Sequence, residues 1–373
     1  MKHLALIALA AASALTFSAC DKNDEQKKPV ETAAGFYVLN QGNASSGVPS
    51  TLTAFDYESG MGSGSNSCAF QNANNFQLGS NATDAMQYGS KLYIASYSSD
   101  VIWVADPVTL KVISQIQPGN ELAGHNPRHF TAHKGKVYAS MYTGYVAEID
   151  TTLCAITREI KVGPNPEGLA VSRGKLYVGN SDGMNWTAGY TDNSISIIDL
   201  DKWTETQWQD HSKFFNVTKL ISRGDDLFAL SMGDYGAIKS SVKRIRDREV
   251  TDICEATTMA VSGNTLYTVN CVYGDVANSK FRAFDITSLQ EVSNPFINQT
   301  SSADAKIDYT TAVGVDPITG DIVITSNYVD PATGWGLYSD PGYANIYDRN
   351  GNFKQRISTG VGPVEIVFVH SYK

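Results

Sequence analysis

The sequence has few of the residues and motifs that are typical of enzymes and metal-binding proteins. Its 373 residues include only 5 cysteines and 6 histidines. No two cysteines form a Cys-x-x-Cys pair, and only His125, His129 and His133 lie close together along the chain. HExxH, P-loop and dinucleotide-binding motifs are also missing. Because these motifs mark zinc hydrolysis, nucleotide hydrolysis and nicotinamide chemistry, we predict no catalytic residue.

The chain also lacks an excess of positive charge. Its 29 Lys and Arg face 38 Asp and Glu, which gives a formal net charge of −9. Nucleic-acid binding depends on clustered Lys and Arg that neutralise phosphates, so no nucleic-acid partner is expected. The densest basic run, Lys239–Arg248, is interpreted as a solvated outer strand.

Beyond its first residues the sequence has no apolar run long enough to cross a bilayer. Leu4–Leu15 is itself too short, follows a basic start and leads to Ser18-Ala19-Cys20, a pattern typical of a secretory signal. This ending resembles a bacterial lipoprotein box. Residues 1–19 are therefore predicted to be a signal peptide and Cys20 the lipid attachment residue, with an ordinary signal peptide as the alternative.

Residues 20–34 are charged and have no apolar periodicity, which predicts a disordered tether after the lipidated cysteine. The charged start of this tether resembles the export signal that Bacteroidetes use to place lipoproteins on the cell surface. The resemblance implies an outer-membrane protein that is exposed at the surface and touches the membrane through its lipid anchor alone. A plain solvated linker has a similar composition, so that alternative stays open.

One sequence unit recurs along residues 35–373 at intervals of about 40 to 55 residues. Each copy has a turn such as Gly-Lys, a strand of the type Leu-Tyr-Val, a variable loop and a third strand ending in Asp. Short strands without intervening amphipathic helices indicate an all-β fold, and this period is typical of a four-stranded propeller blade. We predict a seven-bladed β-propeller whose ring is closed by the C-terminal strand, Gly362–Val369, pairing into the first blade.

The aspartates that end the third strands are predicted to be structural, because an Asp side chain accepts hydrogen bonds from the turn that follows it. They are Asp56, Asp106, Asp150, Asp199, Asp285 and Asp348.

The long loops of this propeller are expected on one face, together with the links between blades. They are rich in Tyr and Trp mixed with Asn and Asp. Such rings offer a flat apolar face with a hydrogen-bonding edge, and an exposed set of them is typical of a binding surface. The alternative is that the rings fold down and cap the core. The predicted ligand-binding residues are Tyr97, His125, Arg128, His129, Tyr142, Trp186, Tyr190, Tyr235, Tyr273, Asn327, Tyr328, Trp335 and Tyr338.

Several residues leave more than one interpretation open. His125 and His129 share a blade link, where they could ligate a metal or contact a ligand, although ordinary hydrogen bonding is favoured. Cys254 and Cys271 could form a disulfide in an exported protein or remain buried thiols. Carboxylates near the mouth could support a Ca²⁺ site of the lactonase type but show no recognisable ligand set; they are Asp84, Glu167, Asp182 and Asp308.

Two sets of motifs carry a family resemblance. The repeat, with GKLYVGNSDG and VGPNPEGLAV as examples, resembles the YncE-like seven-bladed propellers over essentially all of residues 35–373. GFYVLNQGN near the start and the segment from Thr310 to Phe368 resemble a set of Bacteroidetes surface lipoproteins. That set includes the cobalamin-capturing propellers of the BtuG group, which sit on a TonB-dependent outer-membrane transporter.

The resemblance implies a binding protein with no catalytic cofactor. Its ligand would be cobalamin or a related corrinoid, and its partner a TonB-dependent receptor that takes over the captured nutrient. Related proteins make siderophores, haem and glycans the alternative cargoes. The alternatives from different functional classes are a lactonase-like or other metal-dependent propeller hydrolase and a structural or adhesion propeller, since one propeller fold hosts many functions.

Overall fold

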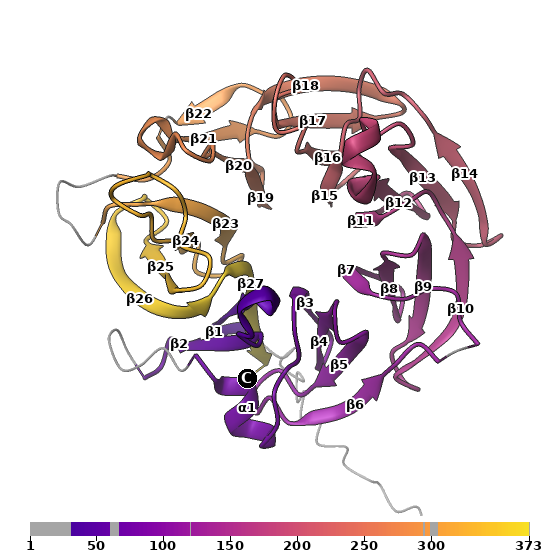
Figure 1. The fold of residues 1–373 in the computed structure, drawn as a ribbon, viewed down its shortest axis with the longest axis horizontal. Helices are drawn as coiled ribbons and strands as arrows, with labels where there is room; N and C mark the ends of the chain where they lie inside the picture. The colour runs from indigo at the N-terminus through magenta and orange to yellow at the C-terminus, as the bar shows by residue number, and fades with distance from the viewer. Residues whose placement is uncertain (1–30, 60–66, 120, 294, 299–304, 373) are drawn as a thin grey trace, which may run out of the picture.

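The strands form seven antiparallel sheets arranged as blades around a central axis (Figure 1). The computed structural model describes residues 31–59, 67–119, 121–293, 295–298 and 305–372. Within these residues six sheets have four strands and one has three. The predicted all-β, seven-bladed propeller is therefore confirmed. The predicted signal peptide, Cys20 and most of the predicted tether lie outside the described residues.

The strands of each blade are given from the central axis outward. Blade 1 contains β27 (Pro363–Tyr372), β1 (Glu31–Asn40) and β2 (Thr51–Asp56). Blade 2 contains β3 (Ala82–Tyr88), β4 (Lys91–Ser96), β5 (Val101–Ala105) and β6 (Val112–Ile116). Blade 3 contains β7 (Pro127–His133), β8 (Lys136–Met141), β9 (Tyr145–Asp150) and β10 (Ala155–Lys161). Blade 4 contains β11 (Pro166–Ser172), β12 (Lys175–Asn180), β13 (Ser194–Asp199) and β14 (Thr204–Trp208).

The remaining three blades repeat the same order. Blade 5 contains β15 (Val217–Arg223), β16 (Asp226–Ser231), β17 (Ser241–Arg246) and β18 (Glu249–Glu255). Blade 6 contains β19 (Thr258–Ser262), β20 (Thr265–Asn270), β21 (Lys280–Asp285) and β22 (Glu291–Ser293). Blade 7 contains β23 (Tyr309–Val315), β24 (Ile322–Asn327), β25 (Pro341–Tyr347) and β26 (Phe353–Val361).

The core consists of apolar layers between neighbouring blades. Every residue of β5 is buried, because a middle strand has another blade packed against each of its faces. Between blades 2 and 3, for example, Tyr93 and Val104 share one cluster with Phe130 and Val137. Outer strands such as β10 are largely exposed. Apolar residues at successive positions of the middle strands thus fix the stacking of the blades.

The ring closes where the last strand joins the first. β27 pairs with β1 from Glu31 opposite Tyr372 to Asn40 opposite Pro363, and β27 also contacts the inner strands of blades 7 and 2. The predicted closure by the C-terminal strand is confirmed. Residues 31–34, which the sequence assigns to the tether, lie in β1 and take part in this pairing.

Blade 1 differs from the others because the described residues give it no fourth strand. The helix α1 (Ala69–Asn74) lies against β2 instead. Its Phe70 is fully buried, with its ring centroid 5.7 Å from that of Trp103 in β5. This helix therefore fills the outer part of the layer between blades 1 and 2.

The aspartates that end the third strands hold the turns on the lower face. Asp150 Oδ1 accepts hydrogen bonds from the backbone amides of Thr152 and Leu153 at 2.8 and 2.9 Å. The same two-amide pattern recurs at Asp56, Asp106, Asp199, Asp285 and Asp348. Their predicted structural role is confirmed.

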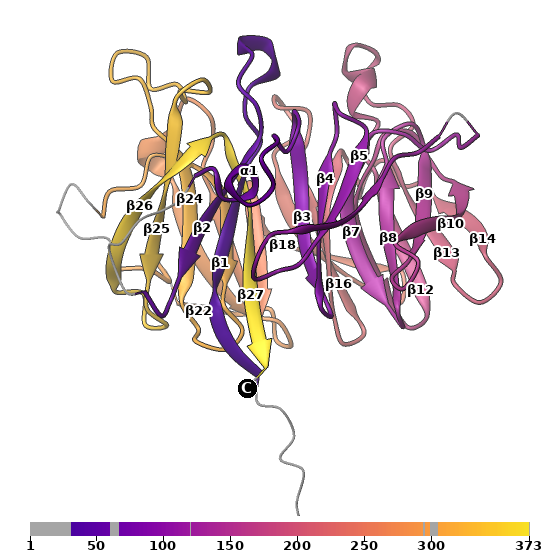
Figure 2. The ribbon, with the colours of Figure 1, turned by 90° about the horizontal axis from the view of Figure 1, so that it is seen from below.

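The two faces of the ring differ sharply (Figure 2). Three tall loops rise from the upper face, namely the β1–β2 loop with η1 (Ala44–Ser46), the β12–β13 loop with η2 (Gly183–Ala188) and the β24–β25 loop. The lower face carries the short turns and the paired ends of β1 and β27. The long loops thus share one face, as the repeat predicts.

Two details of the sequence interpretation change. Within the basic run Lys239–Arg248, residues Ser241–Arg246 form β17, which is the third strand of blade 5 and is covered by β18, so it is not the outermost strand. Cys254 and Cys271 are both free thiols, so the disulfide alternative is not observed. Among the described residues no helix is long and apolar enough to span a membrane.

Candidate functional site

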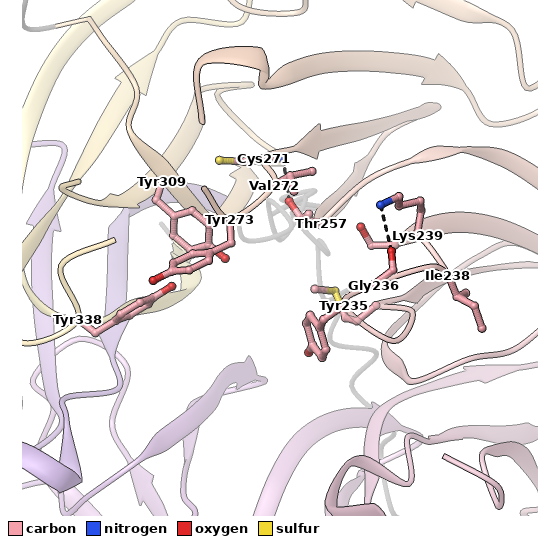
Figure 3. A pocket seen from close by; sticks show the side chains of 12 residues that line it. Tyr235, Gly236, Ile238, Lys239, Thr257, Cys271, Val272, Tyr273, Tyr309 and Tyr338 are labelled. Carbon is pink, nitrogen blue, oxygen red and sulfur yellow. Dashed lines mark hydrogen bonds between the residues drawn. The ribbon is translucent and has the colours of Figure 1, made fainter. Parts of the chain in front are cut away.

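A cavity of about 400 Å³ opens on the upper face over blades 5, 6 and 7. We call it the tyrosine pocket. Figure 3 shows Tyr273, Tyr309 and Tyr338 grouped on one side of it and Tyr235 on the other. Between the two sides lie Thr257, Cys271 and Val272. The pocket is therefore a slot with an aromatic wall.

Tyr273 is the centre of the aromatic wall. Its ring centroid lies 5.6 Å from that of Tyr309 at a perpendicular angle and 6.0 Å from that of Tyr338 at 29°. Trp335, just outside the pocket lining, lies 6.0 Å from Tyr273 as well. Aromatic pairs in such geometries gain about 0.5–1.5 kcal/mol beyond their buried area. The rings hold one another in place, so this wall exists before any ligand arrives.

The tyrosine pocket is nearly free of charge. Burial raises the pKa of Tyr309 and of Tyr338, so both remain neutral phenols at physiological pH. Of the described residues that line the pocket, only Lys239 is charged, and its Nζ donates to the Gly236 carbonyl at 3.0 Å. Burial also raises the pKa of the Cys271 thiol, which disfavours the reactive thiolate. This lining suits an uncharged, flat ring.

A second cavity of about 580 Å³ lies on the upper face over blades 4 and 5. We call it the tryptophan pocket, and its aromatic lining consists of Trp186, Tyr190, Phe215 and Tyr235. Trp186 is 66% exposed, whereas Tyr190 is only 6% exposed and packs on Phe215 with a centroid distance of 5.3 Å. Tyr235 lines both pockets, so the two cavities adjoin.

The unusually long β12–β13 loop builds one wall of the tryptophan pocket. The buried Asp182 holds this loop, because its Oδ2 accepts from Asn185 Nδ2 at 3.1 Å and from the Asp192 amide at 2.9 Å. Gly189 ends η2 with φ 84°, and a Cβ at this residue would meet no atom within 4 Å. The loop thus presents Trp186 while leaving open space beside it.

A third group of predicted residues forms an ion-pair cluster near the central axis. Arg128 on β7 donates from Nε and Nη2 to the two carboxylate oxygens of Glu167 on β11, at 2.8 and 2.9 Å. Its guanidinium carbon lies 5.3 and 5.1 Å from the ring centroids of Tyr97 and Tyr142. Bidentate pairing and cation–π contact both orient this group. These four residues therefore bind one another across three blades.

His129 joins the same cluster and extends it to Asp84. Its Nε2 lies 3.3 Å from Glu167 Oε2 and its Nδ1 3.6 Å from Asp84 Oδ2. Burial lowers the pKa of His129, but hydrogen bonding and charge interactions with Asp84 and Glu167 outweigh this and raise it to about 9. His129 is thus a cation at neutral pH and links the inner strands β3, β7 and β11.

The remaining predicted residues lie apart from both pockets. His125 Nδ1 is 2.7 Å from Asp100 Oδ2, and this hydrogen bond raises the pKa of the histidine. Asn327 is 2% exposed at the end of β24. Tyr328 packs on the buried Tyr343 with a centroid distance of 4.7 Å. In this structure each of them contacts other parts of the protein.

The predicted ligand-binding residues do not include Tyr309, Phe215 or Asn43. Tyr309 and Phe215 complete the two pockets, and both stand in blade links that the sequence places on the same face as the long loops. Asn43 lies in the motif GFYVLNQGN, and its side chain contacts the β24–β25 loop that carries Tyr338. Only the approach of the first and last blades reveals that contact.

The described residues give no support to a lactonase-type metal centre. No group of three or more His, Cys, Asp or Glu among them is arranged to hold a metal ion. Asp84 and Glu167 contact His129 and Arg128, and Asp308 accepts from Tyr343 Oη at 3.1 Å. These carboxylates are occupied by protein partners.

One serine has the spacing of a nucleophile motif without its geometry. Gly179–Gly183 reads Gly-Asn-Ser-Asp-Gly, which matches the letters of the Gly-x-Ser-x-Gly elbow. Ser181 is fully buried, and its Oγ donates to the Asn165 carbonyl at 2.8 Å. The pentapeptide leads from β12 into the short 3-10 helix η2 of a propeller loop rather than into the α-helix that the elbow requires. We therefore assign Ser181 no catalytic role.

The geometry defines the class of this protein as a seven-bladed β-propeller with aromatic cavities on one face. Comparison with known proteins agrees on the fold. No family model matches the chain, and no curated protein matches it. Among solved structures, Kuenenia stuttgartiensis hydrazine synthase is 18% identical with a TM-score of 0.56, covering 75% of this chain and 87% of that one.

Two further solved structures share the architecture. A chain of the mitotic checkpoint complex is 11% identical, with a TM-score of 0.54 over 98% of this chain and 90% of its own. The U3-55K structure is 8% identical, with a TM-score of 0.51 over 73% of this chain and 79% of its own. At such low identity these similarities show the fold alone.

Proposed function

We propose that this protein is a surface-anchored binding propeller that captures a corrinoid, most simply cobalamin, on its upper face. The observation that carries the proposal is the preformed aromatic wall of Tyr273, Tyr309, Tyr338 and Trp335 beside a cavity whose described lining is charged only at Lys239. Ligand sites are typically apolar, aromatic and largely preformed, with a few polar groups that fix orientation. The resemblance to the YncE-like and BtuG propellers supplies the ligand class.

The chemistry of a corrinoid fits this face. The molecule is broad and bears amide arms, so it needs an open site with apolar surface and hydrogen-bonding edges. Tyr and Trp provide both at small entropic cost. Tyr235, Trp186 and Trp335 are 74%, 66% and 57% exposed, which is costly for solubility unless a ligand covers them. No resident metal or catalytic group is required for capture.

The position of the chain ends supports an anchored arrangement. Glu31, the first described residue, pairs with Tyr372 on the lower face, opposite the pockets (Figure 2). In our proposal Cys20 carries the lipid, residues 20–30 join it to this lower face, and the pockets point away from the outer membrane. The captured corrinoid then passes to a TonB-dependent transporter, the partner that the same resemblance implies.

Isothermal titration calorimetry of the purified propeller with cobalamin tests the proposal. We expect a Kd of about 1 μM or tighter, that is, at least about 8 kcal/mol of binding free energy. Trp335→Ala should weaken binding at least about tenfold, while Leu153→Ala, which truncates an even more exposed apolar side chain on the lower face, should not. Absence of cobalamin binding overturns the ligand assignment, and haem, siderophores and oligosaccharides in parallel titrations then identify the alternative cargo.

A further inference from the structure

The two cavities on the upper face differ in shape and lining although they share a wall. The tyrosine pocket is the smaller, and its rings stand on opposite sides of a slot (Figure 3). The tryptophan pocket is larger and more open, and two of its lining residues are the glycines 183 and 189. Such a pair of sites is unnecessary for a ligand that consists of a single ring system.

Tyr235 joins the two cavities through the β16–β17 loop. Asp234 Oδ1 accepts from the amides of Gly236 and Ile238, both at 2.8 Å, which fixes the turn. Tyr235 itself has φ 58° and is 74% exposed. The ring therefore stands up between the pockets on a firmly held turn, where one ligand can touch both of its sides.

We propose that a single two-part ligand spans both cavities across Tyr235. Its small aromatic base enters the tyrosine pocket, and its larger amide-bearing macrocycle lies in the tryptophan pocket against Trp186. This inference deepens the proposed corrinoid function and rests on it, because cobalamin combines such a macrocycle with a benzimidazole nucleotide.

The lining of each cavity decides which part enters it. A planar heteroaromatic base stacks well on the aromatic wall of the slot, where the rings of Tyr273 and Tyr338 lie 29° from parallel and Tyr235 stands on the opposite side (Figure 3). A corrin ring is less suited to that slot, because methyl groups and amide arms project from its rim. The wider cavity beside Trp186 has Gly189 at its edge and open space there. It accepts a bulky rim without a clash.

Titration with cobalamin and with cobinamide, the same macrocycle without the nucleotide and base, tests the assignment. The unsubstituted protein should bind cobalamin about tenfold or more tightly than cobinamide. Tyr338→Ala should weaken the binding of cobalamin about tenfold and change the affinity for cobinamide by no more than about twofold. Trp186→Ala should weaken both corrinoids about tenfold. Tyr273→Ala provides a second variant of the slot, and thermal unfolding of each variant shows that it is folded.

The outcomes separate the two proposals. If Tyr338→Ala and Tyr273→Ala weaken cobalamin and cobinamide equally, or if Trp186→Ala changes neither, the two-part arrangement is wrong while corrinoid capture stands. If neither corrinoid binds the unsubstituted protein, the proposed function fails and this inference fails with it. The two-part arrangement is supported if Tyr338→Ala and Tyr273→Ala lose the tighter binding of cobalamin over cobinamide and Trp186→Ala does not.

Discussion

The side-chain amide of Asn43 donates a hydrogen bond to the backbone carbonyl of Tyr338 at 3.0 Å. The same nitrogen lies 3.1 Å from Ser339 Oγ, while Asn43 Oδ1 accepts from the Ser46 amide and caps η1. A loop of the first blade therefore holds the loop of the last blade that carries Trp335 and Tyr338 of the aromatic wall. The shape of the binding face thus depends on a contact between the two blades that meet where the ring closes.

Replacing Asn43 should reduce the affinity for the ligand more than it reduces the stability of the fold. A neutral hydrogen bond contributes about 0.5–1.5 kcal/mol, so Asn43→Ala should lower affinity for the ligand roughly 3- to 10-fold. The melting temperature should change by only a few degrees, since η1 is exposed. Calorimetry and thermal unfolding measure the two effects. Asn264→Ala, which removes an exposed side-chain hydrogen bond on the lower face, should leave affinity unchanged; an equal loss there would contradict the positioning role.

The Arg128–Glu167 pair should matter for stability far more than surface pairs do. Glu167→Gln leaves the partly buried guanidinium of Arg128 and the cation of His129 without the buried carboxylate that they share, and breaking a buried pair costs up to about 3–5 kcal/mol. Urea unfolding measures the loss. In the matched control Glu291→Gln, which removes the partner of the half-buried Arg282, we expect less than about 1 kcal/mol. Similar losses in both variants would contradict a larger contribution to stability from the ion-pair cluster near the central axis.

The raised pKa of His129 predicts a pH dependence on the alkaline side. The pKa is about 9 in the folded protein against an ordinary value of 6.5, so the stabilisation is complete below pH 6.5 and is lost as pH rises through 9. The free energy of unfolding should therefore fall between pH 7 and pH 9.5. Chemical denaturation across this range measures the slope. His129→Gln should flatten it, and an unchanged slope in that variant would assign the effect to other groups.

The environments of Cys254 and Cys271 lead to a prediction about the reactivity of their thiols. Cys254 Sγ lies 3.6 Å from Thr268 Oγ1, and Cys271 Sγ accepts from the Thr310 amide at 3.4 Å. Burial raises the pKa of both thiols, so they should resist iodoacetamide in the native protein. After denaturation without reductant both should be alkylated, as read by mass spectrometry. Alkylation of these two residues only after reduction would instead reveal a disulfide.

The fold was predictable from local signals. The repeated strand pattern marks the blades, and each third-strand aspartate makes its turn through two backbone amides close in sequence, as Asp150 does. Because a propeller repeats one sheet, identification of the unit determines the ring. The closing strand was predictable for the same reason, since its sequence matches inner strands of other blades.

The candidate site was predictable only in part. Sequence position puts Tyr97, Tyr142, Trp186 and Tyr338 on one face, but it does not say which loops converge. Tyr97 and Tyr142 bend towards Arg128 near the axis, whereas Tyr338 meets Tyr273 from the next blade. Those choices depend on packing between blades, where partners are far apart in sequence. The sequence therefore identifies the face but not the two separate cavities.

Ring closure gives the last prediction. Removing residues 363–373 deletes β27, the inner strand of blade 1, and leaves one long edge of β1 unpaired. It also removes Ile366 and Val367 from the two apolar clusters that join blade 1 to its neighbours on either side. Because the blades stabilise one another around a closed ring, the variant should lose cooperative thermal unfolding or melt more than about 10 °C lower. A variant that ends after Val369 keeps most of the pairing and should remain close to the full chain. Differential scanning calorimetry compares the three proteins, and native-like melting of the shorter variant would contradict closure by β27.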